Sequence, residues 1–284
     1  MGIGNQFRTV VLLGLLTGIL LWIGSFWGSS GLTIAIFFAA IMNFGAYWFS
    51  DKLVLAIYRA KPVTEKEYPK LYKIVREVSQ LAKIPMPKVY IVPGNWSNAF
   101  ATGRNYNHAA VACTQGILEL LNDDELKGVI AHEISHIKNR DTLIQAVAAT
   151  IAGVISYIAM MARYAAIFSG SNRDRKGGSG LELLVLAILT PIIATLIRLA
   201  ISRSREYLAD ESAAKTLHSG LGLASALEKL EKGVIAHPLA VSSTTETTAH
   251  LFIASPFRGG GLVTLFQTHP SIKSRVERLR RMKI

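Results

Sequence analysis

Long hydrophobic runs alternate with polar stretches along the chain and divide it into four parts. No charged residue occurs between Arg8 and Asp51. Within this interval two apolar runs, 9–27 and 32–50, are separated by the short polar turn GSSG. Each run approaches the roughly 20 residues that a helix needs to cross a hydrocarbon core of about 30 Å. We therefore expect residues 1–52 to form an N-terminal transmembrane hairpin.

The charges that flank this hairpin predict its orientation. Arg8 precedes the first run, basic residues such as Lys52 and Arg59 follow the second, and the turn between them has none. Positively charged flanks tend to stay in the cytoplasm. Both ends of the hairpin are therefore expected there, together with residues 53–142, which form the first part of a cytoplasmic domain.

A second hydrophobic hairpin is expected at residues 143–201. The uncharged stretches 143–162 and 183–197 are joined by SGSNRDRKGGSG, and Pro191 predicts a kink in the second stretch. If both stretches cross the membrane, Arg173, Arg175 and Lys176 lie outside, against the usual orientation. We favour a spanning hairpin, and the alternative is a hairpin that dips into the bilayer or packs against the first two spans. Residues 202–284 then form the second part of the cytoplasmic domain, ending in a basic tail that we expect to contact anionic headgroups.

Residues 53–142 have a mixed pattern of helix and strand. Apolar positions from Leu71 to Leu81 have helical spacing and predict a helix over 64–83. The segments KVYIV, NAFATG and AAVACT read as three short strands. Asn122, with Glu125 three residues later, predicts a capped helix start. The fold class is thus a mainly α membrane protein: transmembrane helices plus a cytoplasmic α+β domain with a small β-sheet.

Composition supports the membrane assignment and restricts the partners. Half of the 284 residues are hydrophobic, and the formal net charge is +12. In so apolar a chain an anionic lipid bilayer explains the positive charge better than a nucleic acid does. The single cysteine, Cys113, excludes an intrachain disulfide.

The capped helix carries the motif HEISH at 132–136. His132 and His136 are four residues apart and project from one face, with Glu133 beside them. Two neutral imidazoles can bind zinc, and a nearby carboxylate can take a proton from an activated water. Alone, a match of this length also occurs by chance in unrelated proteins, where it is a polar face on a core helix.

A second cluster of acidic residues follows the second hairpin, in SRSREYLADESAAK. Glu206 can supply the third protein ligand that catalytic zinc requires, and Asp210 can orient a ligand histidine. The alternative is a solvated helix face paired with Arg203 and Arg205. Both clusters lie close to an apolar segment, and a hairpin returns its ends to the same side of the bilayer. The two halves of a zinc site can therefore meet at the cytoplasmic surface.

Four stretches together resemble the HtpX-type membrane zinc metalloproteases, which are distantly related to the CaaX prenyl endopeptidases: NAFATG, AAVACTQGILELLNDDELKGVIAHEISHIKNRD, SRSREYLADESAA and THPSIKSRVERL. The resemblance covers nearly the whole chain. It implies a zincin-like gluzincin endopeptidase of the plasma membrane that degrades misfolded or damaged membrane proteins under stress. It also implies one Zn²⁺ per chain, held by His132, His136 and Glu206, with Glu133 as the catalytic base.

Other site assignments have structural alternatives of equal weight. NAFATG is expected to be an edge strand to which an extended substrate adds, with Asn98 holding a substrate carbonyl and Ala99, Phe100 and Ala101 pairing with the substrate backbone. Asn98 is equally typical of a turn before a strand. His269 is a candidate for stabilising the oxyanion, or else it simply precedes a helix. Such a protease is also expected to cleave itself once solubilised.

Three other classes of protein are disfavoured. A scaffold that keeps zinc only for structure would usually show four ligands. A transporter would carry charged or broken helices at mid-membrane depth, whereas the titratable cluster here lies outside the apolar runs. A prenyl-peptide endopeptidase would need more membrane segments to enclose a chamber. The sequence does not specify an oligomeric state.

Overall fold

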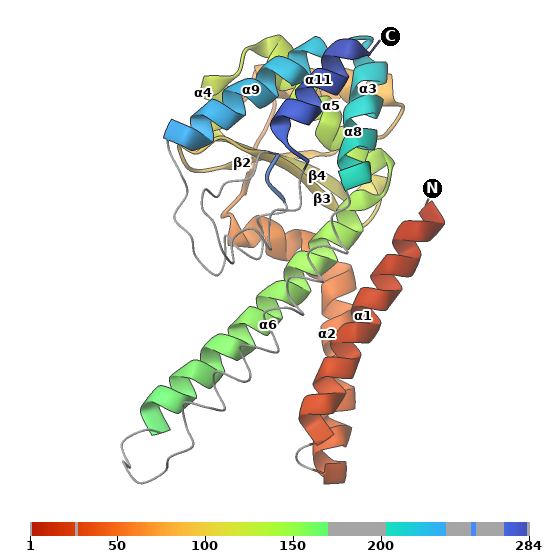
Figure 1. Ribbon diagram of the computed structural model, residues 1–284, viewed down its shortest axis with the longest axis vertical. Helices are drawn as coiled ribbons and strands as arrows, with labels where there is room; N and C mark the ends of the chain where they lie inside the picture. The colour runs from red at the N-terminus through yellow and green to blue at the C-terminus, as the bar shows by residue number, and fades with distance from the viewer. Residues whose placement is uncertain (1, 26–27, 170–202, 237–250, 254–269, 283–284) are drawn as a thin grey trace.

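The computed structural model describes residues 2–25, 28–169, 203–236, 251–253 and 270–282. Three long helices extend from one side of a compact domain (Figure 1). They are α1 (Gly2–Ser25), α2 (Gly28–Ile57) and α6 (Asp141–Ser169). The second half of the predicted hairpin at 143–201 lies outside the described residues, so its alternatives stay open.

Helices α1 and α2 form the expected N-terminal hairpin and pack against the first turns of α6. The shared core contains Leu12 and Leu16 of α1, Ala39 of α2, and Ile144 and Ile151 of α6. The connection from α5 to α6 is only Asn139 and Arg140, so α6 leaves the domain directly from its centre.

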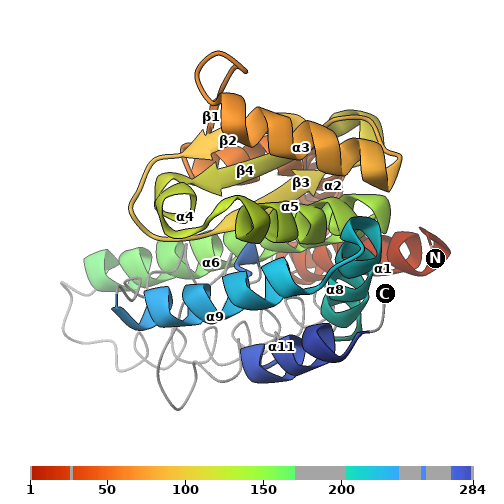
Figure 2. The ribbon, with the colours of Figure 1, turned by 90° about the horizontal axis from the view of Figure 1, so that it is seen from above.

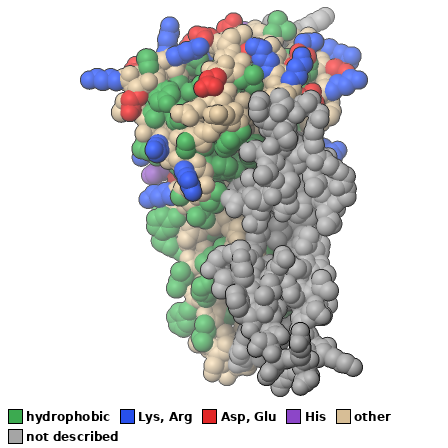
Figure 3. Space-filling view, turned by 90° about the vertical axis from the view of Figure 1, so that its left-hand side faces the viewer, with side chains coloured by type: hydrophobic (Ala, Val, Ile, Leu, Met, Phe, Trp, Pro, Cys, Tyr) green, Lys and Arg blue, Asp and Glu red, His purple; other side chains and the backbone are tan. Residues whose placement is uncertain are grey.

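The surface of the long helices is strongly apolar. Among the described residues, the one helix long and apolar enough to cross a membrane, by length and composition, is Gly28–Ile57, and Phe7–Trp22 and Asp141–Ile155 are shorter apolar stretches. Large hydrophobic side chains of α2 are exposed, among them Ile34, Phe37, Ile41 and Phe44. Figure 3 shows such side chains along the helical half and Lys and Arg on the domain above it. Exposed apolar surface of this extent marks an interaction with a membrane or another protein.

The domain contains a four-stranded sheet in the order β1-β2-β4-β3. Its strands are β1 (Lys61–Pro62), β2 (Lys88–Val92), β3 (Ala99–Gly103) and β4 (Ala109–Thr114). β2 and β4 are parallel, whereas β1 and β3 are antiparallel to their neighbours. The three predicted strands are confirmed, and β3 lies at an edge as expected. The two-residue β1 was not predicted.

In the described part of the chain the domain also contains the helices α3 (Pro69–Ala82), α4 (Gln115–Leu120), α5 (Asp123–Lys138), α8 (Arg203–Leu217), α9 (Leu221–Ala236) and α11 (Ile272–Arg281), with a 3₁₀ turn, η1 (Tyr106–His108). The helix predicted to start at 64 begins at Pro69, a residue well suited to a first helical position. Figure 2 shows α5 between the sheet and the layer formed by α8, α9 and α11.

Helix α5 is the centre of this domain. Asn122 and Glu125 form the predicted capping box, and every residue from 128 to 137 is buried. Gly128 and Gly222 let α5 approach the start of α9 closely. A Cβ atom at Gly128 would lie 2.5 Å from the backbone nitrogen of Leu223. Backbone-to-backbone contact therefore fixes the position of the HExxH helix.

This contact predicts the effect of adding one methyl group. Gly128→Ala should lower the free energy of unfolding by about 1–3 kcal/mol, because two backbones must separate. Gly153→Ala is the control, since nothing lies within 4 Å of a Cβ there. It should be neutral or stabilising by up to about 1 kcal/mol, as alanine favours helix. Thermal unfolding in detergent compares the two, and equal melting temperatures would contradict the close approach.

Candidate metal centre and active site

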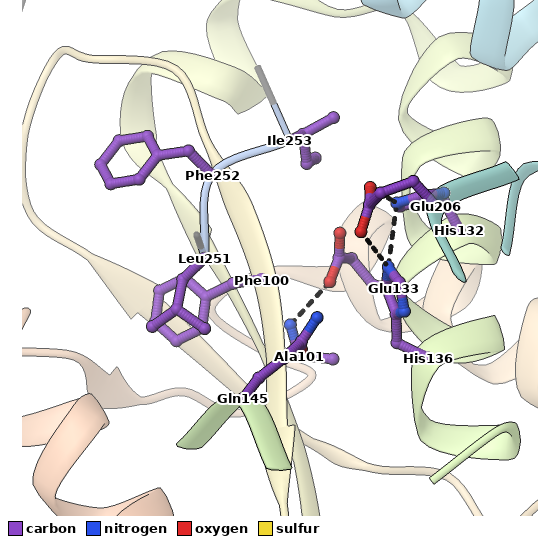
Figure 4. A pocket seen from close by; sticks show the side chains of 10 residues that line it. All are labelled: Phe100, Ala101, His132, Glu133, His136, Gln145, Glu206, Leu251, Phe252 and Ile253. Carbon is purple, nitrogen blue, oxygen red and sulfur yellow. Dashed lines mark hydrogen bonds and ion pairs between the residues drawn. The ribbon is translucent and has the colours of Figure 1, made fainter. Parts of the chain in front are cut away.

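Two turns of α5 direct His132 and His136 to the same point in the interior. Their side chains are buried, and their rings lie at 87° to each other with centroids 4.7 Å apart. Glu206, from the beginning of α8, reaches the same point and lies against both histidines (Figure 4). The predicted meeting of these two distant segments thus occurs, and Glu206 faces inward instead of toward solvent.

The three side chains fit a tetrahedral metal. The His132 Nε2 and His136 Nε2 atoms are 3.2 Å apart. Glu206 Oε2 lies 3.6 Å from His132 Nε2, and the other oxygen, Oε1, lies 3.5 Å from His136 Nε2. One ligand atom from each of the three residues lies within 4.8 Å of the other two. A tetrahedral zinc with bonds of about 2.0–2.2 Å would separate its ligand atoms by roughly 3.4 Å. Two imidazoles and one carboxylate at these spacings match the donor set of a catalytic zinc, with a fourth position left for water or substrate.

The other ring nitrogen of each histidine is bound by an aspartate. His132 Nδ1 lies 2.9 Å from Asp210 Oδ1, and His136 Nδ1 lies 3.1 Å from Asp141 Oδ2. Such carboxylates fix the ring so that Nε2 points at the metal. The contact made by Asp210 is the one its spacing from Glu206 suggested.

Sequence reasoning missed Asp141. This residue is the first of α6 and folds back onto α5 because Arg140 adopts a left-handed backbone conformation, with φ of 59°. Its second carboxylate oxygen lies 3.7 Å from Arg205 Nη1. The available signal was an acidic residue five positions after His136, immediately before an apolar run.

Sequence reasoning also missed Arg275, and the prediction that the basic tail contacts headgroups is wrong for this residue. Arg275 is fully buried, and its Nε and Nη2 atoms donate to the two oxygens of Asp210 at 2.8 and 2.7 Å. Figure 1 places α11 at the end of the domain opposite the long helices. The Arg275 guanidinium outweighs the effect of burial and holds the pKa of Asp210 well below its usual value.

Glu133 lies beside the three ligands, on the side of the sheet. Its Oε2 accepts a hydrogen bond of 2.7 Å from the backbone nitrogen of Ala101 in β3. Burial raises the pKa of Glu133, against the opposing effect of the two histidines. A carboxylate with a raised pKa is a stronger base and is better matched to proton transfer near neutral pH.

These groups line one pocket with an empty volume of about 270 Å³. Figure 4 shows its other walls: Phe100 and Ala101 of β3, Gln145 of α6, and residues 251–253. Sequence reasoning also missed Gln145 as a residue that lines the pocket, although an amide within an uncharged run was a signal. Cys113 is fully buried in the domain core, where burial raises the pKa of its thiol.

The remaining predicted residues have different outcomes. Asn98 is buried at the start of β3, and its carboxamide bonds the backbone of residues 251–253. Its contact with a substrate, and those of Ala99, Phe100 and Ala101, stay predictions. His269 lies outside the described residues, so its role as an oxyanion donor also stays a prediction.

A buried His-His-Glu cluster with an adjacent glutamate on an HExxH helix defines a metallopeptidase site, and comparison with known proteins agrees. The sequence pattern of Peptidase family M48 matches residues 65–283. A "Protease HtpX homolog" from Syntrophobacter fumaroxidans is 51% identical over 283 residues, covering 98% of this chain and all of that one. One from Pyrococcus furiosus is 52% identical over 283 residues, covering 99% and 97%. The chain belongs to peptidase family M48 and is a metalloprotease.

A solved structure shares the fold. The crystal structure of S. mikatae Ste24p aligns with a TM-score of 0.52 and 18% sequence identity. The alignment covers 98% of this chain and 65% of Ste24p, so this chain spans less than two thirds of that protein. The likeness shows that the two proteins share a fold.

The environment of His132 predicts how zinc affinity depends on pH. Burial lowers its pKa, but the hydrogen bonds to Asp210 and Glu206 outweigh burial and raise the pKa to about 9. Below that pH, zinc must displace a proton from the metal-free site. Chelator competition should show affinity rising about tenfold per pH unit below this pKa. Asp210→Asn should weaken binding and flatten this slope, and a pH-independent affinity of the wild type would contradict the assignment.

The contact of Asp141 with His136 predicts a role in metal binding. Asp141→Asn should weaken zinc binding about 10–100-fold, because the asparagine lacks the charge that supports the ligand histidine. Asp124→Asn, at an exposed position on α5, the helix that carries His136, is the control and should bind zinc like the wild type. Equal zinc affinity in both variants would remove Asp141 from the site.

Proposed function

We propose that the chain is a zinc-dependent endopeptidase of the plasma membrane, with its catalytic domain on the cytoplasmic side. Its substrates are unfolded or damaged membrane proteins, and its role is membrane protein quality control under stress. The observation that carries the catalytic part is the convergence of His132, His136 and Glu206 on one buried point, with Glu133 beside them.

The membrane part of the proposal rests on the long helices. Helix α2 has the length and apolar surface of a membrane span, and α1 packs along it with an exposed apolar face. Cationic side chains lie where α2 meets the domain, including Lys52 over Phe49 and Arg104 over Trp48. Such residues are typical of the boundary between lipid and cytoplasm. A multi-pass protein with this boundary would hold its active site just above the bilayer.

An edge strand at the pocket supports unfolded chains as substrates. Among the described strands, β3 pairs with β4 on one side only, and its residues are buried, with Phe100 and Ala101 lining the pocket. The backbone nitrogen of Ala101 donates to Glu133. An extended segment added along Ala99 to Ala101 would lie directly beside the metal ligands. Strand addition recognises the backbone, so it accepts many sequences but requires an unfolded segment. The same requirement explains why partly unfolded copies of the enzyme should be cleaved by their neighbours.

The chain's own residues divide the chemistry between binding and proton transfer. His132, His136 and Glu206 would hold Zn²⁺, which supplies a Lewis acid that polarises the scissile carbonyl and acidifies water. Glu133 takes the proton from the attacking water and returns it to the leaving amine. The Ala101 N–H orients the carboxylate of Glu133 for both transfers. The buried walls of the pocket limit access of bulk water.

Replacement of the proposed base separates metal binding from catalysis. Glu133→Gln should retain stoichiometric zinc, because Glu133 is not a ligand, and should lose cleavage of an unfolded protein such as casein by a factor of at least about 100. Glu231→Gln, at an exposed position on α9, should leave both unchanged. Metal analysis and a cleavage assay in detergent make the test. Cleavage by zinc-loaded Glu133→Gln protein would refute the role of Glu133.

Cysteine labelling tests the orientation of the N-terminal hairpin. Single-cysteine proteins are made by Ser30→Cys or Lys66→Cys in a Cys113→Ala background, since both positions are exposed. An impermeant maleimide should label the Ser30→Cys protein in intact cells and the Lys66→Cys protein only after permeabilisation. The opposite pattern would place the catalytic domain outside the cytoplasm.

A further inference from the structure

Residues 251–253 form one wall of the pocket, opposite the metal ligands (Figure 4). We call these three residues the cleft segment. Leu251, Phe252 and Ile253 are each at most 6% exposed. A short segment that is this deeply buried at the site, and so far in sequence from α5 and β3, must be held by specific contacts.

One side chain holds both ends of the cleft segment. The Asn98 Nδ2 atom donates to the carbonyl of Leu251 at 3.1 Å, and Asn98 Oδ1 accepts from the backbone nitrogen of Ile253 at 3.1 Å. Asn98 is itself fixed, because its backbone bonds Thr114 of β4. This two-point contact locks the segment to the start of β3.

Aromatic packing holds the middle of the cleft segment. The ring of Phe252 lies 5.3 Å from Trp96 and 6.3 Å from Tyr58, measured between centroids. Tyr58 also packs on Phe100, the β3 residue that lines the pocket. The segment and the edge strand thus share one aromatic cluster, which sets the distance between the two walls of the cleft.

Arg275 joins the cleft segment to the metal site. Its Nη1 donates to the carbonyl of Ile253 at 2.9 Å, while Nε and Nη2 bind Asp210, which in turn binds His132. A fully buried guanidinium needs several partners to offset its desolvation. Here the partners are the carbonyl of Ile253 in the cleft segment and the carboxylate of Asp210, which binds the proposed zinc ligand His132. A lysine at this position would keep the positive charge but could not bind Ile253 and Asp210 at the same time.

We infer that Arg275 is a positioning residue that fixes the cleft segment and His132 in one geometry, so that the substrate cleft and the metal site are built as a unit. Asn98 acts on the substrate through the cleft segment, which it holds in place as a wall. The inference rests on the proposed zinc ligands and adds the link between metal binding and substrate binding.

Three readouts on five purified full-length proteins test this link. The proteins are the wild type, Arg275→Lys, Asn98→Ala, Asp141→Asn and the matched control Arg280→Lys. Arg280 is on the same helix and makes an exposed ion pair with Glu228. The readouts are zinc affinity by chelator competition, KM and kcat for a quenched peptide, and hydrogen exchange of the peptide that contains Ile253. Circular dichroism verifies that each variant is folded.

Each variant has its own expected pattern. Arg275→Lys should lower zinc affinity about tenfold or more and also expose the Ile253 amide to exchange. Asn98→Ala should expose the same amide and raise KM roughly tenfold, with zinc affinity unchanged. Asp141→Asn, which contacts the other histidine, should lower zinc affinity with the Ile253 amide still protected. Arg280→Lys should match the wild type in every readout.

Two results would overturn the inference. One is an Arg275→Lys protein that loses zinc affinity while the Ile253 amide keeps its protection. The other is an Asn98→Ala protein in which the protection of the Ile253 amide and the KM are both unchanged. This second result overturns the inference even if Arg275→Lys fails to fold. Hydrogen exchange needs neither zinc nor activity. A wild type that binds no zinc or cleaves no substrate would therefore refute the proposed function. That result can be distinguished from the two results that overturn the inference.

Discussion

Burial of charge around α5 is the constraint on which the rest of the structure depends. Two histidines and four acidic side chains are buried together, and each unpaired buried charge would cost several kcal/mol. Each has an oppositely charged or hydrogen-bonding partner. Asp210 pairs with His132, Asp141 with His136, the Ala101 amide with Glu133, and Arg275 with Asp210 and Glu206. A dication would complete this set by binding Glu206 and both imidazoles. The fold brings α6, α8 and α11 to α5 because each supplies one of these partners.

The site is thereby joined to the part of the chain that we assign to the membrane. Asp141 is both the first residue of α6 and the support of His136, and Gln145, one turn later, lines the pocket. The tilt of α6 and the orientation of a metal ligand are therefore mechanically linked. On the other side of the cleft, Tyr58 follows directly after α2 and packs on Phe100. Both walls are thus anchored at the ends of long apolar helices.

Local signals made much of this predictable from sequence. The capping box at Asn122 predicts the start of α5, and helical spacing places His132 and His136 on one face. Short apolar runs bounded by proline, glycine and other turn residues predict β2 to β4. The third protein ligand that catalytic zinc requires predicts the role of Glu206. Arg275 and the cleft segment were not found, because their partners are distant in sequence: Arg275 lies 65 residues from Asp210, and Ile253 lies 155 from Asn98. Only the packed fold determines such pairings. Nothing in the sequence of the basic C-terminal segment distinguishes the buried Arg275 from its exposed neighbours.

Zinc K-edge absorption spectroscopy of the purified protein tests the central claim most directly, because it counts ligands without relying on activity. The account predicts one zinc per chain with two imidazoles and a shell of nitrogen and oxygen at about 2.0–2.2 Å, and no sulfur. Glu206→Ala should lose one oxygen from that shell or lose the metal. A sulfur scatterer, fewer than two imidazoles, or a spectrum unchanged by Glu206→Ala would contradict the assignment of His132, His136 and Glu206.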